Sequence, residues 1–285
     1  MGTSTPFGGP KGGNPLVPDF VNDDEPVAEP APTDGDEAPP DPPAPSERPE
    51  QIPPPTPDRF RSARRNFTKF ARSGGDDRRA LGRAVSQYVS QASGGSGPAA
   101  QRMGSSRGVT AGIAKFLGDV NARGIHAALA TFNLSSLAGS PAADILSALV
   151  EHFCPEGGSI DEGIARDAFM ETVIDLAEAG ISDMANLTPE QMQTLLELYV
   201  THTIEDRIYN DIGIKGIELP PDLNAVQAVQ DQLHDFILGS VSDAFNEAAI
   251  DFTAIDPGAI GQTVDSIYEA AFDILEAIGE EEAKK

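Results

Sequence analysis

The chain has 285 residues, a formal net charge of −25 and a single cysteine, Cys154. One cysteine excludes an intramolecular disulfide framework and is typical of a reducing compartment, and no apolar run reaches the ~18 residues that a transmembrane helix needs. The N-terminus lacks the basic and then apolar order of a signal peptide, so we expect a cytoplasmic protein with no membrane partner.

The charges divide the chain into three parts. Residues 1–60 hold 12 acidic and three basic residues, residues 61–125 hold 12 basic and three acidic ones, and residues 126–285 hold 30 acidic and five basic ones. Because phosphate binding depends on Lys and Arg, the acidic last part should repel nucleic acid. Only the basic middle part could bind it.

Residues 1–57 form an N-terminal tail that we predict to be disordered. The tail contains 17 of the 24 prolines and few aliphatic residues, so it cannot bury enough apolar surface to offset the entropy of ordering. PxxP spacings such as Pro39 to Pro42 favour polyproline II. A stiff spacer explains these spacings better than a ligand for SH3 domains does.

The start of the tail presents a glycine. Gly2 is small enough that Met1 should be removed, which leaves a free and unhindered glycine amine. N-myristoylation is disfavoured because Pro6 stands where Ser or Thr is required. The long tail keeps this amine away from the folded body, so we expect the amine to be presented to a partner.

Residues 58–107 begin with a basic helical segment. Phe60, Phe67 and Phe70 recur at helical spacing and predict a narrow apolar stripe, and Asp58 is a plausible N-cap for this helix. The cations should project from the polar sides of the segment. They are Arg59, Arg61, Arg64, Arg65, Lys69, Arg72, Arg78 and Arg79.

A second short helix should follow, and then a flexible linker. Asp76 or Asp77 can cap this helix. The run of Gly and Ser over residues 93–98 predicts the linker. We therefore expect the basic segment to be separate from an acidic domain over residues 108–285.

Residues 108–285 show helical patterns throughout and no alternating β pattern of useful length. Ser159 with Glu162 and Thr188 with Gln191 have the spacing of capping boxes. Other residues predicted to begin helices are Ser140, Asp222 and Asp256. We predict an all-α fold, a bundle of about six to eight helices preceded by the disordered tail.

Histidines and the cysteine do not have the spacing of a metal or catalytic site. The histidines His126, His152, His202 and His234 form no HExxH motif and no pair at i, i+4, and Cys154 has no CxxC partner. His152 lies near Cys154, but an incidental pair explains this better than a catalytic one.

Four carboxylates recur on one predicted helix face: Asp167, Glu171, Asp175 and Glu178. Such a stripe could bind Mg²⁺ or Ca²⁺, but it is more often a solvated face or a docking surface for a basic partner. We therefore predict no catalytic residue, no metal site and no cofactor.

Two stretches of the chain carry a family resemblance. The first is Met1-Gly-Thr-Ser with the following Gly-Pro-Lys-Gly-Gly-Asn-Pro-Leu-Val-Pro. The second is Arg-Phe-Arg-Ser-Ala-Arg-Arg-Asn-Phe-Thr-Lys-Phe ahead of Asp77-Arg-Arg-Ala-Leu-Gly-Arg. In this order, over roughly residues 1–105, they resemble the QatB family, a component of the Qat anti-phage defence systems of bacteria.

The resemblance implies three companion proteins: an ATPase, an enzyme related to the deazaguanine synthase QueC, and a TatD-like metal-dependent nuclease. It also implies that the chain itself is not an enzyme. QueC chemistry activates a deazaguanine carboxylate with ATP for attack by an amine, and the resemblance suggests that a protein N-terminus beginning with glycine can supply that amine.

Gly2 is therefore the predicted modification site, through an amide bond to a deazaguanine base. An α-amine has a pKa near ~7.7–8.0, against ~10.4 for lysine, so a useful fraction is nucleophilic at neutral pH. Recognition of the tail by the QueC-like enzyme would use Thr3, Ser4, Phe7, Gly8, Gly9, Pro10, Leu16 and Val17. The ATPase and the nuclease are further candidate partners.

Two other functions remain open. A nucleic-acid adaptor would use the cations of residues 58–107 on phosphates, with Phe or Tyr available for base stacking. Docking of the basic segment on the acidic part of the same chain, or on an acidic partner, is favoured over this. A structural scaffolding protein would use the tail as a passive spacer.

Overall fold

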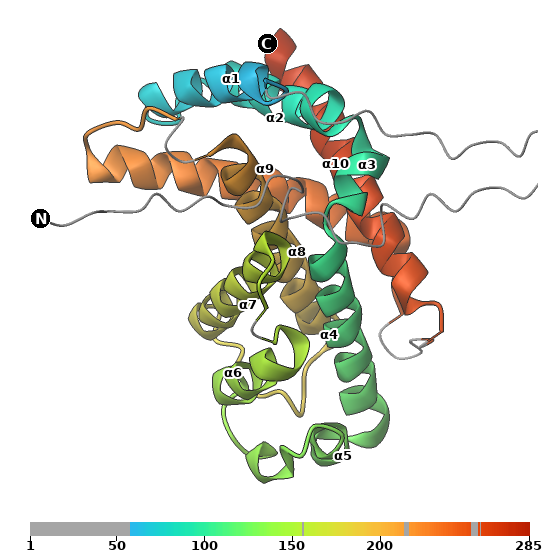
Figure 1. The fold of residues 1–285 in the computed structure, drawn as a ribbon. Coiled ribbons are helices and arrows are strands. Elements are labelled where there is room, and N and C mark those ends of the chain that lie inside the picture. Colours follow the sequence, from blue (N-terminus) through green and yellow to red (C-terminus); the bar gives the residue numbers. More distant parts are fainter. Residues whose placement is uncertain (1–57, 156, 214–216, 252–255, 257) are drawn as a thin grey trace, which may run out of the picture. The chain divides into compact units, whose positions relative to one another are not determined.

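The computed structural model describes residues 58–285 except residues 156, 214–216, 252–255 and 257. The described residues belong to one compact unit and form ten α-helices and no strand (Figure 1). Eight of these helices have ten or more residues, and the other two have six. The predicted all-α class is confirmed. The predicted disordered tail, residues 1–57, lies outside the described residues.

The helices follow one another with short connections. In chain order they are α1 (Arg61–Arg72), α2 (Arg78–Gln87), α3 (Ser96–Gln101), α4 (Gly104–Arg123), α5 (Ile125–Ala130), α6 (Ala142–Phe153), α7 (Ile160–Glu178), α8 (Pro189–Ile212), α9 (Leu223–Ala248) and α10 (Ile260–Lys284). A π-helix joins α2 to α3 (Tyr88–Ser93), and a 3-10 helix precedes α6 (Ser135–Leu137).

The basic segment is packed into the same core as the later helices. Where a flexible linker was expected over residues 93–98, the chain ends the π-helix and begins α3. α4 then runs through residues 107 and 108, the expected boundary, without a break. Phe67, Phe70 and Leu81 belong to the hydrophobic core that α8, α9 and α10 also share.

Several of the predicted N-caps are confirmed. The carboxylate of Asp77 accepts a hydrogen bond of 2.9 Å from the backbone of Ala80 at the start of α2. Ser159 and Thr188 both form complete capping boxes, and Asp222 caps α9. In each of these helices a side chain satisfies backbone N–H groups that have no partner within the helix.

The caps predicted at Asp58 and Ser140 are wrong, whereas Asp256 accepts a hydrogen bond of 2.8 Å from the backbone N–H of Gly258 and its carbonyl oxygen accepts from Ile260 at 3.0 Å. α1 begins after Phe60 with no side-chain cap, and α10 begins after Ala259. α6 begins at Ala142, whose N–H donates to the carbonyl oxygen of Ser182 at 2.8 Å. The backbone N–H of Ala142, which Ser140 was expected to cap, thus finds its partner in a residue distant in the sequence.

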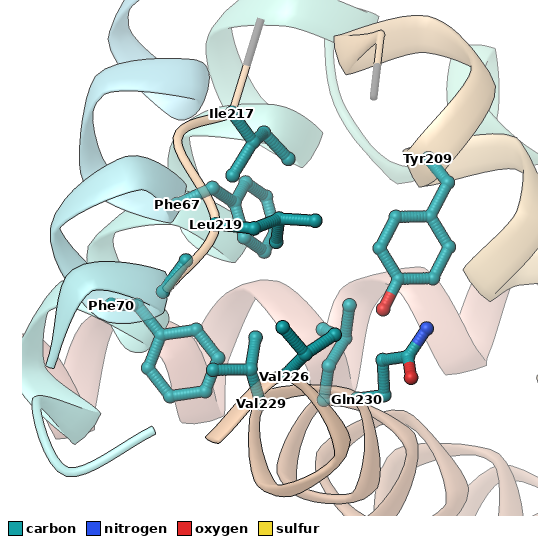
Figure 2. Close-up of a pocket in the computed structure, with 10 residues that line it drawn as sticks. Phe67, Phe70, Tyr209, Ile217, Leu219, Val226, Val229 and Gln230 are labelled. Atoms are coloured by element: carbon teal, nitrogen blue, oxygen red, sulfur yellow. The ribbon is translucent and has the colours of Figure 1, made fainter. Parts of the chain in front are cut away.

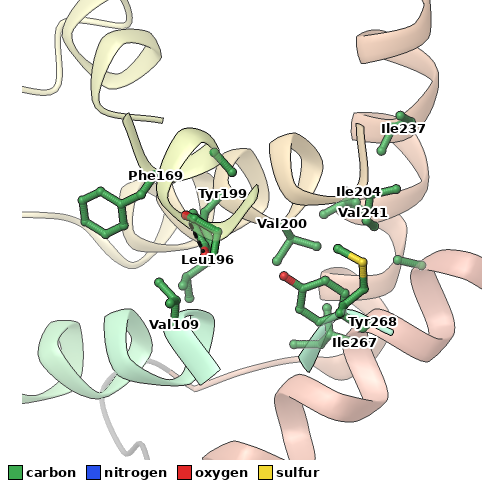
Figure 3. Close-up of a cluster of buried hydrophobic side chains, with 14 of the residues drawn as sticks. Val109, Phe169, Leu196, Tyr199, Val200, Ile204, Ile237, Val241, Ile267 and Tyr268 are labelled. Atoms are coloured by element: carbon green, nitrogen blue, oxygen red, sulfur yellow. Dashed lines mark hydrogen bonds between the residues drawn. The ribbon is translucent and has the colours of Figure 1, made fainter. Parts of the chain in front are cut away.

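α8 lies at the centre of the core (Figure 3). It packs against α7, α9 and α4, and α10 packs against α2, α3, α4 and α9. The buried Tyr268 links α10 to α4 and α8. Its hydroxyl lies 3.1 Å from Oγ1 of Thr110 in α4 and 2.9 Å from Oγ1 of Thr203 in α8.

α2 and α10 approach each other closely at Gly82 and Gly279. A Cβ on Gly82 would lie 2.6 Å from the carbonyl oxygen of Gly279, and a Cβ on Gly279 would lie 2.8 Å from that of Gly82. Both contacts are with backbone atoms. The absence of a side chain at these positions therefore sets how closely the basic segment packs on the C-terminal helix.

Candidate functional site

The predicted tail site lies outside the described residues. This applies to Gly2 and to all the predicted recognition residues: Thr3, Ser4, Phe7, Gly8, Gly9, Pro10, Leu16 and Val17. Their role stays a prediction, and the surfaces described below belong to residues 58–285.

The basic segment presents a ridge of cations to solvent. Arg61, Arg65, Lys69 and Arg72 recur at intervals of four, four and three on α1, and all four are exposed. Arg72 forms an ion pair with Glu218. Exposed cations at the start of α2 are Arg78 and Arg79. Within the described part of the chain, the ridge makes no other ion pair.

Two other predicted basic residues, Arg59 and Arg64, are less exposed than the residues of the ridge. Arg64 is half-buried, and its Nε donates to the carbonyl oxygen of Ile212 at 2.8 Å. The guanidinium of Arg59 lies 4.6 Å from the ring centroid of Phe60. Arg64 thus joins the basic segment to the end of α8.

The aromatic residues of the basic segment are not available for base stacking. Phe67, Phe70 and Tyr88 are all buried, and Phe60 stacks on Tyr88 with 5.8 Å between ring centroids. The expectation that Phe or Tyr could stack on bases is therefore wrong, because Phe67, Phe70 and Tyr88 fill the core and the half-buried ring of Phe60 is occupied by Tyr88 and Arg59. A nucleic-acid interface here would rest on phosphate contacts alone.

A buried ionic network joins the basic segment to the acidic part of the chain. The carboxylate of Asp211 in α8 accepts hydrogen bonds from the Tyr88 hydroxyl at 2.8 Å and from Nη2 of Arg102 at 2.7 Å. Nε of Arg207 lies 3.5 Å from the same carboxylate oxygen. The basic segment thus docks on the chain's own acids through Arg102, a residue outside the predicted basic set, as well as through the exposed ion pair of Arg72 with Glu218.

An acidic cleft of about 550 Å³ lies between α7, α8 and α9. His202 of α8 is held between two carboxylates of α7, with Nε2 lying 2.7 Å from Oδ2 of Asp175 and Nδ1 lying 3.1 Å from Oε2 of Glu171. His234 of α9 reaches the same place, and its Nδ1 lies 3.1 Å from Oε2 of Glu205. The centroids of the two imidazole rings are 5.1 Å apart.

The sequence-based search missed this pairing of histidines. His202 and His234 stand on different helices, so no local spacing joins them. The available signal was His202 with Glu205, which lie three residues apart and therefore share a helix face. The predicted carboxylate stripe is divided by the fold, since Glu171, Asp175 and Glu178 line the cleft whereas Asp167 does not.

Burial and nearby charges shift the pKa values of several groups in the cleft, among them His202 and Asp206. Burial favours the neutral form of His202, but the hydrogen bonds with Glu171 and Asp175 outweigh it and raise the pKa of His202 above its usual value. Burial, together with the charges of Glu171 and Glu205, raises the pKa of Asp206 to about 7. The cleft therefore holds a proton on Asp206 at a pH where an exposed aspartate is ionised.

Replacing Asp206 with asparagine should stabilise the protein much more at pH 8 than at pH 5, measured by urea unfolding in EDTA. Between pH about 4 and 7 the folded state keeps a proton on Asp206 that the unfolded chain has lost, so stability falls as pH rises. A pKa difference of this size corresponds to ~4 kcal/mol. Solvent screening in the open cleft leaves about 2 kcal/mol.

Asp231 supplies the matched control for this prediction, because it lines the same cleft but is exposed. Asp231→Asn should change stability by less than about 0.5 kcal/mol at either pH. A gain from Asp206→Asn of equal size at pH 5 and pH 8 would show that the cleft does not retain the proton.

A smaller apolar pocket of about 110 Å³ adjoins the cleft (Figure 2). Phe67 and Phe70 of α1 face Tyr209 of α8 across it, and Val226 and Val229 of α9 line another side. Tyr209 and Gln230 also line the acidic cleft. The pocket therefore lies between the basic segment and the acidic helices.

His152 and Cys154 do not form a reactive pair. Cys154 is buried, and burial raises the pKa of its thiol to about 12. The thiol is therefore protonated at neutral pH and a poor nucleophile. His152 packs instead against the ring of Phe132.

None of the helices formed by the described residues has the length and apolar character to span a membrane.

A family model described as the Qat anti-phage system associated protein QatB matches residues 94–275. No curated protein and no solved structure matches the chain. The match thus covers α3 to α9 and most of α10, whereas the sequence resemblance rested on residues 1–105.

Proposed function

Because the chain belongs to the QatB family of Qat anti-phage system associated proteins, we propose that it serves its defence system as a protein substrate and scaffold and not as an enzyme. Gly2 is the residue acted upon. In a QueC-like partner, the α-amine of Gly2 attacks the carbonyl carbon of a deazaguanine carboxylate that has been activated with ATP. The bond to the activating group breaks, that group leaves, the nitrogen loses a proton, and an amide bond results.

The observation that carries this proposal is the N-terminal sequence of a chain in this family. Met1 precedes a glycine, and a Pro-rich and acidic stretch separates this glycine from the helical unit. The lower pKa of an α-amine favours Gly2 over lysine as the nucleophile. Glycine also places no side chain next to the attacking atom.

Deletion of residues 2–18 tests this role against a passive spacer. In cells that carry the complete defence system, the deletion should abolish protection against phage, measured by plaque counts. As a control, residues 30–46 are replaced with a Gly- and Ser-rich stretch of equal length, which keeps Gly2 on a long tether and should preserve protection. Protection that survives the deletion would support the spacer role instead.

A nucleic-acid interface is the second candidate function, and the exposed cation ridge of α1 and α2 favours it. The test is binding of DNA and RNA to the full chain at two salt concentrations. Arg61, Arg65 and Lys69 are the residues to replace, because they are exposed and contact no other described charge. Salt-sensitive binding that the triple alanine variant loses would support this function.

A further inference from the structure

We propose that the acidic cleft is a binding site for a divalent transition-metal ion, exemplified by Zn²⁺, with His202, Glu205 and His234 as its ligands. One donor atom from each of these residues lies within 4.8 Å of the donors of the other two. His202 and Glu205 project from one face of α8, and His234 comes from α9. The three donors therefore converge from two packed helices.

The nitrogen and oxygen donors select the class of metal. Two imidazoles and one carboxylate form a ligand set that Zn²⁺ uses in proteins, with further positions left for water or substrate. Mg²⁺ and Ca²⁺ prefer sites made of oxygen ligands. The imidazoles therefore distinguish this site from the oxygen-only carboxylate stripe that the sequence indicates on α7.

The surroundings of His202 match those of a metal-bound histidine. Each of its ring nitrogens already lies within 3.1 Å of a carboxylate, Asp175 or Glu171. When one nitrogen binds the ion, the other can donate to its carboxylate. A carboxylate that accepts from the free nitrogen of a ligating histidine orients the ring and increases its basicity.

The charge balance of the cleft provides an independent reason for a cation. Six carboxylates line it, on Glu171, Asp175, Glu178, Glu205, Asp206 and Asp231, and the described lining residues include no Lys or Arg. Oδ2 of Asp206 is buried and has no hydrogen-bond partner among the described residues. Buried polar atoms normally have a hydrogen-bond or metal partner, and a bound cation would offset the negative charge of this cleft.

The competing explanation of this cluster is that the histidines form ion pairs with the carboxylates and bind no metal. A measurement of zinc binding distinguishes the two explanations. The untagged, full-length protein is treated with EDTA, dialysed free of it and titrated with ZnCl₂ in a calorimeter. The wild type should bind a single Zn²⁺, and His234→Gln should lower the affinity for Zn²⁺ at least about tenfold. His126→Gln changes an exposed histidine of α5 and should bind as the wild type does.

Zinc X-ray absorption of the wild type gives a second result that does not depend on the folding of a variant. Two imidazole ligands and additional oxygen ligands are expected. Absence of zinc binding, binding that His234→Gln leaves unchanged, or a zinc ion surrounded only by oxygen would each overturn the proposal. Circular dichroism in EDTA shows whether the variants keep their helices.

Discussion

Replacing Asp211 with alanine is expected to lower the free energy of unfolding by about 3–5 kcal/mol. The side chain of Asp211 is 8% exposed, and its carboxylate accepts hydrogen bonds from Tyr88 and Arg102. The substitution leaves the Tyr88 hydroxyl and the Arg102 guanidinium without this partner. Because a buried charge without a partner is costly, the loss should far exceed that of a surface ion pair.

Asp265→Ala is the matched control for Asp211→Ala. Asp265 pairs with Arg107 at the same distance, 2.7 Å, but its side chain is 56% exposed. The control should cost less than about 1 kcal/mol. Urea unfolding followed by circular dichroism measures the stability of both variants. Similar losses of stability would mean that the burial of Asp211 does not make its ion pair more important for the fold.

Gly82→Ala should destabilise the protein by about 3 kcal/mol, although alanine favours helix formation more than glycine does. The added Cβ would lie 2.6 Å from the carbonyl oxygen of Gly279 and 2.7 Å from the Cβ of Glu282. A backbone carbonyl cannot move aside as the end of a flexible side chain can. α2 must therefore move away from α10, which loosens the packing of the basic segment on the core.

Gly239→Ala in α9 separates this steric effect from helix propensity. Gly239 is exposed, and a Cβ there would meet no atom within 4 Å. This variant should gain about 0.5–1 kcal/mol. If Gly82→Ala also gained stability, the close approach of α2 and α10 would not limit packing.

The sequence predicted what short-range interactions determine. Asp77, Ser159 and Thr188 cap helices as expected, because each cap joins a side chain to a backbone group three residues away. The cap predicted at Ser140 failed because Ala142 finds its partner at Ser182, more than 30 positions along the chain. Local spacing holds no information about such a contact.

The charge pattern along the sequence does not correspond to a division of the described residues into separate domains. Charges lie on the surface, whereas the core is built from apolar faces, so a change of charge along the chain need not coincide with a change of fold. α4 crosses the boundary expected at residues 107 and 108, and Arg102 pairs with Asp211 from the acidic part. Surface composition and core membership are separate properties of this chain.

The candidate metal site could not be predicted from spacing alone, for the same reason. His202 and Glu205, two of the three proposed ligands, share one helix face, and Glu171 and Asp175 were predicted to share a face of α7. The missing element was His234, whose position depends on how α9 packs against α8. Tertiary packing is therefore what completes the constellation.

The central proposal, that Gly2 is a substrate, is tested most directly by the intact mass of the chain after co-expression with the QueC-like enzyme. The mass should increase by that of a deazaguanine acid less one water, and fragmentation should place the addition on the amine of Gly2. Gly2→Leu, which should retain Met1 and so remove the glycine amine, should show no addition. An unmodified Gly2 amine beside a partner that is shown to be active would contradict the proposal.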